Sequence, residues 1–338
     1  MRNDSAWWTI LKRMEDVRVA VVGVGGMGSF HARTLARLTH VELVAVADPM
    51  VDNANRLAAE LGCLADADPY RVAGDEGLDG VVIASPDDTH ADLAVTALEA
   101  GLWVLCEKPL ATTLADAWRV VDAERAIGER RVQLGFMREY DPAHVQLMAT
   151  LGDLGSIDAI RAVHRNTNAT RRPIAQIVGQ SMVHDIHSVR FITGAEIRTV
   201  RAFGAGAADG SFRHTLAVCQ LDSGAHAMVE FDDAGFAYDV SVEVLAQHGD
   251  VLTGAPTRAV KRAQGSTEIH LGNDWFAWFG EAYRAQDRAW TDSIRERVAT
   301  GPSTWDGLVA HAVVEAVLAS LATGSTVEVE PLERPGIY

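Results

Sequence analysis

A lysine that directly follows an apolar segment is the first residue of this chain whose surroundings favour chemistry. Lys108 stands in Glu107-Lys108-Pro109, after the apolar residues 102–106. If that segment is a buried parallel strand, the residue at its end faces the ligand crevice of an α/β sheet. Burial disfavours the charged form of a lysine and lowers its pKa, so a neutral amine becomes available. We predict that Lys108 handles a proton; the alternative is a surface lysine paired with Glu107.

A second candidate for proton transfer lies on one face of a predicted helix. In the segment 179–187, Gln180, His184 and His187 are spaced so that a helix would place them on the same face. An imidazole titrates near neutral pH and can act as a general base, so we predict that His184 works with Lys108. The alternative is a histidine with a purely structural partner. The opposite face would bury Met182, Val183, Ile186 and Val189.

The same helix also permits a metal hypothesis, with His184, Asp185 and His187 as ligands. Consecutive residues of a helix point in different directions, so only the two histidines could converge on one ion. Since zinc and similar ions need three or four protein ligands, we predict no metal site.

A glycine-rich turn precedes these residues in the order typical of dinucleotide binding. The apolar segment 17–22 leads into Gly23-Val24-Gly25-Gly26-Met27-Gly28, a helical pattern follows to Leu38, and a second apolar segment spans 41–47. Such glycines allow a tight turn, close approach to a pyrophosphate and close packing of the helix, whose N-terminus faces the phosphates. The residues predicted to contact a dinucleotide here are Gly23, Gly25, Gly26, Met27, Gly28 and Asp48.

Asp48 ends the second apolar segment at the spacing where a carboxylate accepts hydrogen bonds from the adenosine ribose. Its charge would repel a 2′-phosphate, and no arginine follows it before Arg56. The sequence therefore favours NAD over NADP as the cofactor.

The first half of the chain alternates strand and helix patterns, which predicts a doubly wound parallel sheet of Rossmann type. We assign residues 17–136 to this NAD-binding domain. Right-handed crossovers place the C-terminal ends of all strands on one edge, so Gly28, Asp48, Ser85 and Lys108 should gather there. The predicted helices are 51–61, 87–100 and 112–127, and the further strands are 80–84, 102–106 and 131–135.

Residues 137–338 have a different pattern and are predicted to form a substrate-binding and oligomerisation domain with an α+β fold. Strand-like segments at hairpin spacing indicate an open, largely antiparallel sheet. An open sheet with one uncovered face commonly pairs with a second copy, so we expect a homodimer or homotetramer. The predicted helices are 142–151, 180–191, 276–297 and 305–322, and the strands are 156–164, 198–205, 214–221, 226–232 and 238–247.

Composition limits the classes of partner. The net charge of −16 argues against nucleic acid or an anionic membrane, since both bind basic surfaces. Three widely spaced cysteines suit a reducing cytoplasm rather than a disulfide framework. We find no apolar run near the roughly 20 residues of a membrane span. Residues 1–16, with Trp7, Trp8, Ile10 and Leu11, lack the pattern of a signal peptide and are predicted to be an extension that packs on the body or on a partner.

These motifs together resemble the glucose-fructose oxidoreductase and inositol dehydrogenase family over nearly the whole chain. The segments that carry the resemblance are the glycine turn, Val44-Ala45-Val46-Ala47-Asp48, Ser85-Pro86-Asp87-Asp88-Thr89-His90, Glu107-Lys108-Pro109 and Gly135-Phe136-Met137-Arg138-Glu139-Tyr140-Asp141-Pro142. Three further segments are similar to inositol 2-dehydrogenases in particular. These are His164-Arg165-Asn166, Gly235-Phe236-Ala237-Tyr238-Asp239 and Pro302-Ser303-Thr304-Trp305-Asp306-Gly307.

The resemblance implies an NAD-dependent oxidoreductase that transfers hydride between a ring secondary alcohol of a cyclitol or sugar and the nicotinamide. Lys108 and His184 would be catalytic. Substrate contacts would come from Arg138, Asn166, Gln180 and Tyr238. Further cofactor contacts would come from Ser85, Pro86, His90, Glu107 and Lys108.

One residue departs from the pattern of the inositol dehydrogenases that this chain resembles. They carry an aspartate four residues before the catalytic histidine, where this chain has Gln180. A neutral amide can orient an imidazole but cannot offset its positive charge, so the basicity of His184 should fall. Either Lys108 is then the principal base, or the substrate is an aminocyclitol, a keto-sugar or a modified inositol.

Two alternatives to a freely exchanging dehydrogenase follow from the same residues. Gln180 permits a catalytically silent NAD or sugar sensor, whose melting temperature would rise with ligand although no turnover occurred. A tightly held cofactor that cycles between substrate and product is the other, and it would co-purify with the protein.

Overall fold

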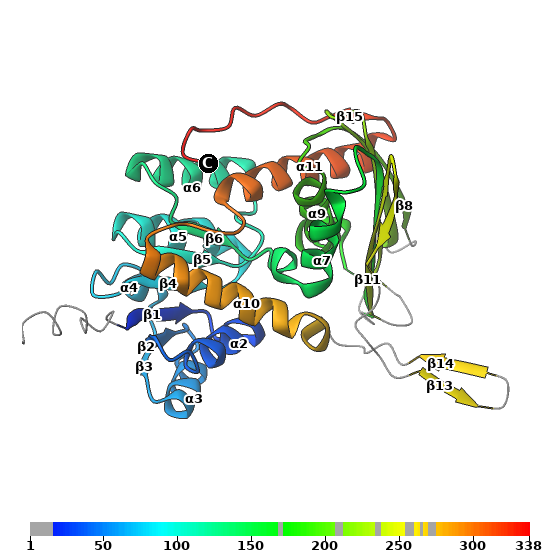
Figure 1. Ribbon diagram of the computed structural model, residues 1–338. Helices are drawn as coiled ribbons and strands as arrows, with labels where there is room; N and C mark the ends of the chain where they lie inside the picture. Colours follow the sequence, from blue (N-terminus) through cyan, green and yellow to red (C-terminus); the bar gives the residue numbers. More distant parts are fainter. Residues whose placement is uncertain are drawn as a thin grey trace, which may run out of the picture.

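Two β-sheets organise the chain, one toward the left and one at the right of Figure 1, and helices lie against both. The computed structural model describes residues 16–167, 172–206, 212–233, 238–253, 260–263, 266–269 and 275–338. Residues 1–15 of the predicted extension lie outside these ranges, as do residues 235–237 of the segment 235–239 named in the resemblance.

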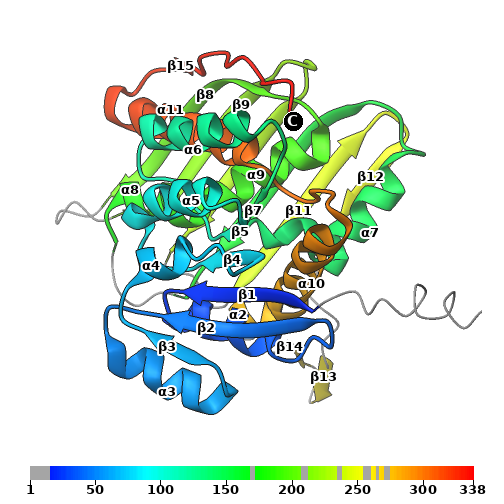
Figure 2. The same ribbon diagram turned by 90° about the vertical axis from the view of Figure 1, so that its left-hand side faces the viewer.

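The first sheet is parallel and has the strand order β3-β2-β1-β4-β5-β6. This order confirms the doubly wound fold expected from the alternating pattern. Its strands are β1 (Val17–Val22), β2 (Val41–Ala47), β3 (Leu64–Asp66), β4 (Gly80–Ile83), β5 (Trp103–Cys106) and β6 (Val132–Leu134). The helices connecting them are α2 (Gly26–Leu35), α3 (Val51–Leu61), α4 (Pro69–Ala73), α5 (His90–Glu99) and α6 (Leu114–Ile127). Figure 2 shows α5 and α6 stacked beside this sheet.

Strand β3 and helix α4 were missed in the sequence. Strand β3 is three residues long and none of them is buried, so it carries no apolar run to mark it. Helix α4 spans five residues and begins with Pro69 after Asp68, whose side chain caps it by accepting from two backbone N–H groups. These elements are defined by pairing and capping rather than by hydrophobic periodicity.

The second sheet has the order β12-β11-β7-β10-β9-β8-β15 and is antiparallel except where β7 pairs with β10. This confirms the largely antiparallel sheet. Its strands are β7 (Ile157–Arg165), β8 (Ile197–Gly206), β9 (Phe212–Leu221), β10 (His226–Asp232), β11 (Asp239–Ala246), β12 (Gly249–Leu252) and β15 (Val327–Glu328). A separate hairpin pairs β13 (Val260–Ala263) with β14 (Ser266–Ile269).

One face of the second sheet is covered by helices α7 (Pro142–Leu151), α9 (Val183–Thr193) and α11 (Thr304–Thr323), as Figure 1 shows. In β10, Ala227, Val229 and Phe231 are buried on this side, while Met228 is exposed on the other. The alternation is that of a sheet with one face in the core and one outside it.

The segment predicted as a helix from residue 180 begins differently. A short turn α8 (Ile174–Gln176) leads into the π-helical segment η3 (Ile177–Met182), and regular helix α9 starts only at Val183. Gln180 therefore lies in a wider turn than His184. π-Helical turns are rare and frequent at functional sites, and no simple residue pattern marks them.

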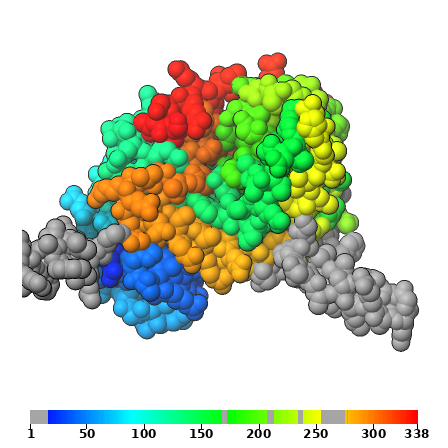
Figure 3. Space-filling model, in the orientation of Figure 1, coloured from blue at the N-terminus to red at the C-terminus, as the bar shows by residue number. Residues whose placement is uncertain are grey.

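Helix α10 (Trp275–Glu296) runs across to the first sheet, although it belongs to the last quarter of the chain. Trp290 is fully buried against β4, where a Cβ at Gly80 would lie 2.8 Å from its ring. Trp290 and Ile294 join the core formed by β1, β4 and β5. The space-filling view shows α10 in orange between the blue N-terminal elements and the green region of α7 (Figure 3). The two predicted domains thus share a core, and their division at residue 136 stays a prediction.

Helix α11 is apolar on average, but Asp306 and Glu315 interrupt it, so it is not an uninterrupted apolar run. Residues 304–323 are long and apolar enough to cross a bilayer by length and composition. In the structure α11 packs against α6, α9 and β8, and Leu308, Val313 and Val317 are fully buried. The apolar character of this helix is therefore explained by its place in the core.

Candidate active site

The glycine turn between β1 and α2 is shaped by two close backbone approaches. Gly23 has a φ of +84°, and a Cβ there would lie 2.6 Å from the backbone of Ala84. A Cβ at Gly28 would lie 1.7 Å from the carbonyl oxygen of Gly23. At Gly25 and Gly26 a Cβ would meet nothing within 4 Å. The first pair is required for packing, whereas the second pair leaves space above the helix N-terminus for a ligand.

Asp48 lies beside this turn and helps to hold it. Its two carboxylate oxygens accept hydrogen bonds from the backbone N–H groups of Val24, at 2.9 Å, and Met50, at 2.8 Å. A cavity of about 610 Å³ opens here. Its lining includes the predicted residues Gly23, Gly25, Asp48, Ser85 and Pro86. We call it the glycine-turn cavity.

A second cavity of about 380 Å³ lies between the two sheets and shares Ala84 and Ser85 with the first. We call it the lysine cavity. Ten predicted residues line it: Met27, Ser85, His90, Glu107, Lys108, Arg138, Asn166, Gln180, His184 and Tyr238. The two cavities share Ala84 and Ser85, so the predicted cofactor residues of the glycine turn and the predicted catalytic residues lie in adjoining spaces.

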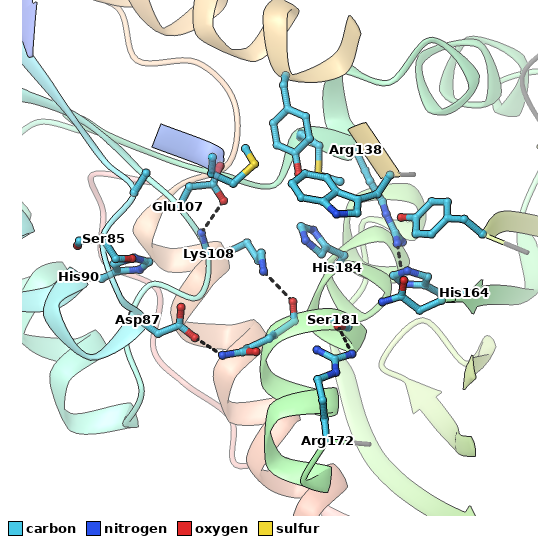
Figure 4. A pocket seen from close by; sticks show the side chains of 18 residues that line it. Ser85, Asp87, His90, Glu107, Lys108, Arg138, His164, Arg172, Ser181 and His184 are labelled. Atoms are coloured by element: carbon cyan, nitrogen blue, oxygen red, sulfur yellow. Dashed lines mark hydrogen bonds between the residues drawn. The ribbon is translucent and has the colours of Figure 1, made fainter. Parts of the chain in front are cut away.

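Lys108 occupies the end of β5, and its peptide bond to Pro109 is cis. Its Nζ donates a hydrogen bond of 2.7 Å to the backbone carbonyl of Gln180, which belongs to the other half of the chain (Figure 4). Burial lowers the pKa of Lys108, although the charges of Glu107 and Asp87 oppose this effect. The surface ion pair considered as an alternative does not form, since the carboxylate of Glu107 turns to another partner.

His184 points into the same cavity as Lys108 (Figure 4). Burial and the neighbouring cations Lys108 and Arg138 hold the pKa of His184 well below its usual value. Its Nδ1 is buried and has no hydrogen-bond partner among the described residues. The ring is thus a neutral imidazole at neutral pH, able to accept a proton.

His187 does not share the cavity with His184, which corrects the expected polar stripe. Its Nε2 lies 2.8 Å from Glu139, and its ring stacks on Phe136 at 4.0 Å between centroids. Only Gln180 and His184 of the three polar residues line the cavity. The predicted apolar residues behave as expected, since Met182, Val183, Ile186 and Val189 are all buried.

Arg138 forms a buried cluster at one wall of the lysine cavity. Its guanidinium pairs with Asp185, and Nη2 lies 3.1 Å from Nδ1 of His164. The same Nδ1 lies 3.1 Å from Asp185, so its tautomer decides which contact is a hydrogen bond. Burial alone would raise the pKa of Asp185, but Arg138 and His164 outweigh it and lower the pKa.

The remaining predicted substrate contacts come from the second sheet. Asn166 follows β7, and its backbone N–H bonds the carbonyl of Asp232 at 2.7 Å. Tyr238 precedes β11 and is buried, with its ring 5.6 Å from that of His164. Both line the cavity, and their contact with a substrate stays a prediction.

Glu107, which lines the lysine cavity, also belongs to a buried charge network. Its Oε1 lies 3.1 Å from Nε2 of His31 in α2, and Nδ1 of His31 lies 2.7 Å from Asp287 in α10. Burial alone would lower the pKa of His31, but the two carboxylates outweigh it and raise the pKa to about 10. A positively charged His31 thus joins three segments that are far apart in the sequence.

His90 and Ser85 are fixed mainly by protein contacts. The two ring nitrogens of His90 lie 2.7 Å from the carbonyl of Pro109 and 2.9 Å from that of Ser85. The hydroxyl of Ser85 lies 2.6 Å from that of Thr89. His90 therefore ties the ends of β4 and β5 together, and a role in cofactor binding would come through packing.

Several lining residues were missed as site residues in the sequence: Ala84, Asp87, Met137, His164, Arg172, Ser181, Trp275 and Tyr283. Asp87 accepts a 2.7 Å hydrogen bond from the side chain of Gln180. Arg172 pairs with Asp233 and donates to Ser181 at 3.1 Å. Trp275 and Tyr283 arrive on α10, and nothing in their local sequence indicates a site.

The metal hypothesis finds no support in the arrangement of its ligands. Asp185 turns to Arg138, His187 to Glu139 and His184 to the cavity. Within the described ranges no group of three or more histidine, cysteine or acidic residues is placed to hold a metal ion.

Comparison with known proteins gives consistent results. Residues 17–136 match a family model described as an oxidoreductase family with an NAD-binding Rossmann fold. Inositol 2-dehydrogenase 1 of Saccharopolyspora erythraea is 40% identical over 335 residues, covering 95% of this chain and 99% of the relative. The inositol 2-dehydrogenase of Mycolicibacterium gilvum is 35% identical and covers 94% of each chain.

Solved structures agree with these relatives. The myo-inositol dehydrogenase of Lactobacillus casei in complex with NAD(H) and myo-inositol superposes with a TM-score of 0.90 and 26% identity, covering 95% of this chain and 99% of that one. A myo-inositol dehydrogenase of Corynebacterium glutamicum gives a TM-score of 0.84 and 28% identity, covering 94% and 99%.

Proposed function

This chain belongs to the glucose-fructose oxidoreductase and inositol dehydrogenase family, and from that premise we propose that Lys108 and His184 handle the proton during oxidation of a ring alcohol. The protein is an NAD-dependent dehydrogenase that acts on CH–OH groups. The observation that carries the residue assignment is that both side chains line one cavity, which adjoins the glycine turn.

When bound, NAD supplies the hydride acceptor for the substrate carbon. Oxidation of a secondary alcohol also releases the hydroxyl proton, which needs a basic side chain within hydrogen-bond reach. Lys108 meets this need because burial lowers its pKa and favours the neutral amine. His184 is a neutral imidazole in the same cavity, and its lowered pKa makes it the weaker base of the two. The products are then a ring ketone, NADH and a proton held by one of these side chains.

We assign the substrate class to cyclitols and related sugars. The lysine cavity presents imidazole, amide and phenol groups from His164, Asn166 and Tyr238, and such groups can bond the several hydroxyls of a polyol. Relatives that match nearly the whole chain are named inositol 2-dehydrogenases. Because Gln180 replaces the aspartate of the inositol dehydrogenases that this chain resembles, the proposed substrates include an aminocyclitol, a keto-sugar or a modified inositol.

A substrate panel tests the proposal. The purified protein is mixed with NAD or NADP and with inositol isomers, aminocyclitols and aldoses, and absorbance at the nicotinamide wavelength is followed. We expect NADH formation with at least one cyclitol or sugar and a preference for NAD. The absence of turnover across the whole panel, with ligands still raising the melting temperature, would contradict it. Cofactor released on denaturation would identify a tightly held form.

We also propose that the protein is a cytoplasmic homo-oligomer. The face of the second sheet that points away from α7, α9 and α11 exposes Phe203, Met228, Leu245 and Leu252, which supports association with a second copy. Cys63, Cys106 and Cys219 are all free, which suits a reducing compartment. Light scattering of the purified protein measures the assembly state.

A further inference from the structure

A hydrogen-bonded chain crosses the lysine cavity from one half of the molecule to the other. Asp87 lies in the turn η1 (Asp87–Thr89), just after β4, and Gln180 lies in η3. The side-chain amide of Gln180 donates to Asp87 at 2.7 Å. Its backbone carbonyl accepts from Lys108 Nζ, also at 2.7 Å. Gln180 thus accepts a hydrogen bond from Lys108 and donates one to Asp87, and both bonds are drawn as dashed lines in Figure 4.

Asp87 differs from the other acidic residue that lines this cavity. Glu107 is bound to His31 in the buried network. Asp87 forms no ion pair with a basic side chain within the part of the chain that the structure describes, and it is only partly buried. Its carboxylate is therefore the acidic group of the lining whose charge is not already matched by a partner.

The cations near Lys108 are in the opposite situation. Arg138 is paired with Asp185, and Arg172 with Asp233. His184 is neutral because burial and the adjacent cations lower its pKa. Substitution of Glu107, Arg138 or Arg172 would break an ion pair with a buried side chain. Substitution of Asp87 removes a charge near Lys108 without breaking an ion pair among the described residues.

We propose that Asp87 is a positioning residue for Lys108: it fixes Gln180, whose carbonyl receives the lysine, and its negative charge favours the protonated lysine. The proposal rests on the proposed function only for its effect on turnover. Its effect on Lys108 itself is independent of any substrate.

The direction of the effect follows from electrostatics. A nearby carboxylate favours the ammonium form of a lysine, whereas burial and nearby cations disfavour it. Glu107 and Asp87 both oppose the lowering of the Lys108 pKa. Replacing Asp87 with asparagine keeps an oxygen that can accept from Gln180 but removes the charge. The Lys108 pKa should then fall further.

The first experiment measures Lys108 without turnover. The full-length protein is labelled with trace acetic anhydride across a pH series, and modification of Lys108 is followed by peptide mass spectrometry. Asp87→Asn should shift the labelling midpoint of Lys108 to lower pH. Asp88→Asn is the matched control, because Asp88 is exposed in the same turn and lies outside the cavity. In this control variant the labelling midpoint of Lys108 should equal that in the protein of original sequence. An unchanged midpoint in Asp87→Asn would overturn the proposal.

The second experiment uses turnover once a substrate is known. If neutral Lys108 accepts the proton, the acid limb of the kcat/KM profile should move to lower pH in Asp87→Asn but not in Asp88→Asn. A purely structural role would lower the melting temperature and the rate without moving the limb. If Asp87→Asn does not fold, Asp87→Ser takes its place. If no compound of the substrate panel is turned over but Asp87→Asn shifts the labelling midpoint of Lys108, the proposed function is rejected. The positioning role of Asp87 is then still supported.

Discussion

The two adjoining cavities are built in different ways. All residues that line the glycine-turn cavity lie between Gly23 and Leu93, in the loops that follow the strands of the first sheet and in the helices α3, α4 and α5. The lysine cavity takes residues from Met27 to Tyr283, contributed by both sheets and by α10. A cavity made from one continuous part of the chain can be recognised from a motif. A cavity assembled from distant segments depends on how those segments pack.

This difference also separates binding from chemistry. In the glycine-turn cavity the decisive groups are backbone N–H groups, glycines and one carboxylate, and their requirement is space. In the lysine cavity the decisive groups are titratable, and their pKa values depend on burial and on neighbours. Substitutions should therefore separate the two cavities, and the largest effects should fall on the second.

Lys108→Ala should separate chemistry from cofactor binding most clearly. We expect kcat/KM to fall by about 10²–10⁴-fold, since that is the usual contribution of a positioned acid or base. NAD affinity, measured by calorimetry, should change much less than kcat/KM, because Lys108 lies outside the glycine-turn cavity. Lys108→Arg is the matched control: it keeps a cation but cannot lose its proton at working pH, so it should be as inactive. Turnover within tenfold of the original in either variant would exclude the assigned role.

His31→Leu should show how strongly distant segments are joined. The substitution leaves Glu107 and Asp287 buried without their cation, which should lower the free energy of unfolding by about 3–5 kcal/mol. Urea denaturation measures this. His40→Leu is the control, because His40 is partly exposed and lies 3.7 Å from Asp292, so about 1 kcal/mol or less is expected. Equal losses in both variants would contradict a special role for the network.

The same network predicts a dependence on pH. The folded pKa of His31 is about 10, against 6.5 for an unperturbed histidine, so protonation stabilises the folded state. The stabilisation is complete below pH 6.5 and disappears as the pH rises through about 10. The difference in unfolding free energy between the original protein and His31→Leu should therefore shrink across that window.

Gly28→Ala and Gly25→Ala should behave differently although they lie in one motif. A methyl group at Gly28 would overlap the carbonyl of Gly23, so we expect a loss of about 1–3 kcal/mol of stability, or more, and weak NAD binding. At Gly25 there is open space, so stability should be kept while NAD affinity falls. Thermal melting with and without NAD checks both. A stable Gly28→Ala variant would show that the turn can relax.

Asp48→Asn should give the smallest effect of the series. We expect NAD affinity to fall about tenfold, or about 1.4 kcal/mol, and the preference over NADP to narrow because the repelling charge is gone. Asp52→Asn is the control, since Asp52 is exposed in the first turn of α3 and lines neither cavity. Unchanged NAD affinity in Asp48→Asn would remove the ribose contact from the assignment.

Much of the fold was predictable because it follows local rules. For most strands and helices of the first sheet, the bounds predicted from the sequence agree with the observed bounds within a few residues. Strand β3 and helix α4 were missed because they are short and carry no apolar periodicity. In the second half, the positions of β7 to β11 were predictable from alternation, whereas the short strands β12 to β15 were missed. The π-helical turn at Ile177–Met182 was not, since its wider hydrogen bonding has no simple residue signature.

For the candidate site, the sequence pointed to Lys108, His184 and Gln180, and the structure brings these into one cavity. It gave no sign that Gln180 bonds Asp87 or that His187 turns away to Glu139. These pairings depend on the path of whole segments through space, which neither propensity nor spacing along the chain encodes.

By itself, the sequence determined the dinucleotide turn, the cofactor and the family, because the space that Gly23 and Gly28 require is set by atoms close to them in the chain or on the adjacent strand. Only the tertiary structure decided the charges of the site. His31 is held positive by Asp287, 256 residues away, and Lys108 meets Gln180, 72 residues away. Electrostatic interactions act through space and strengthen with burial, so they are fixed only when the two halves of the chain have packed together.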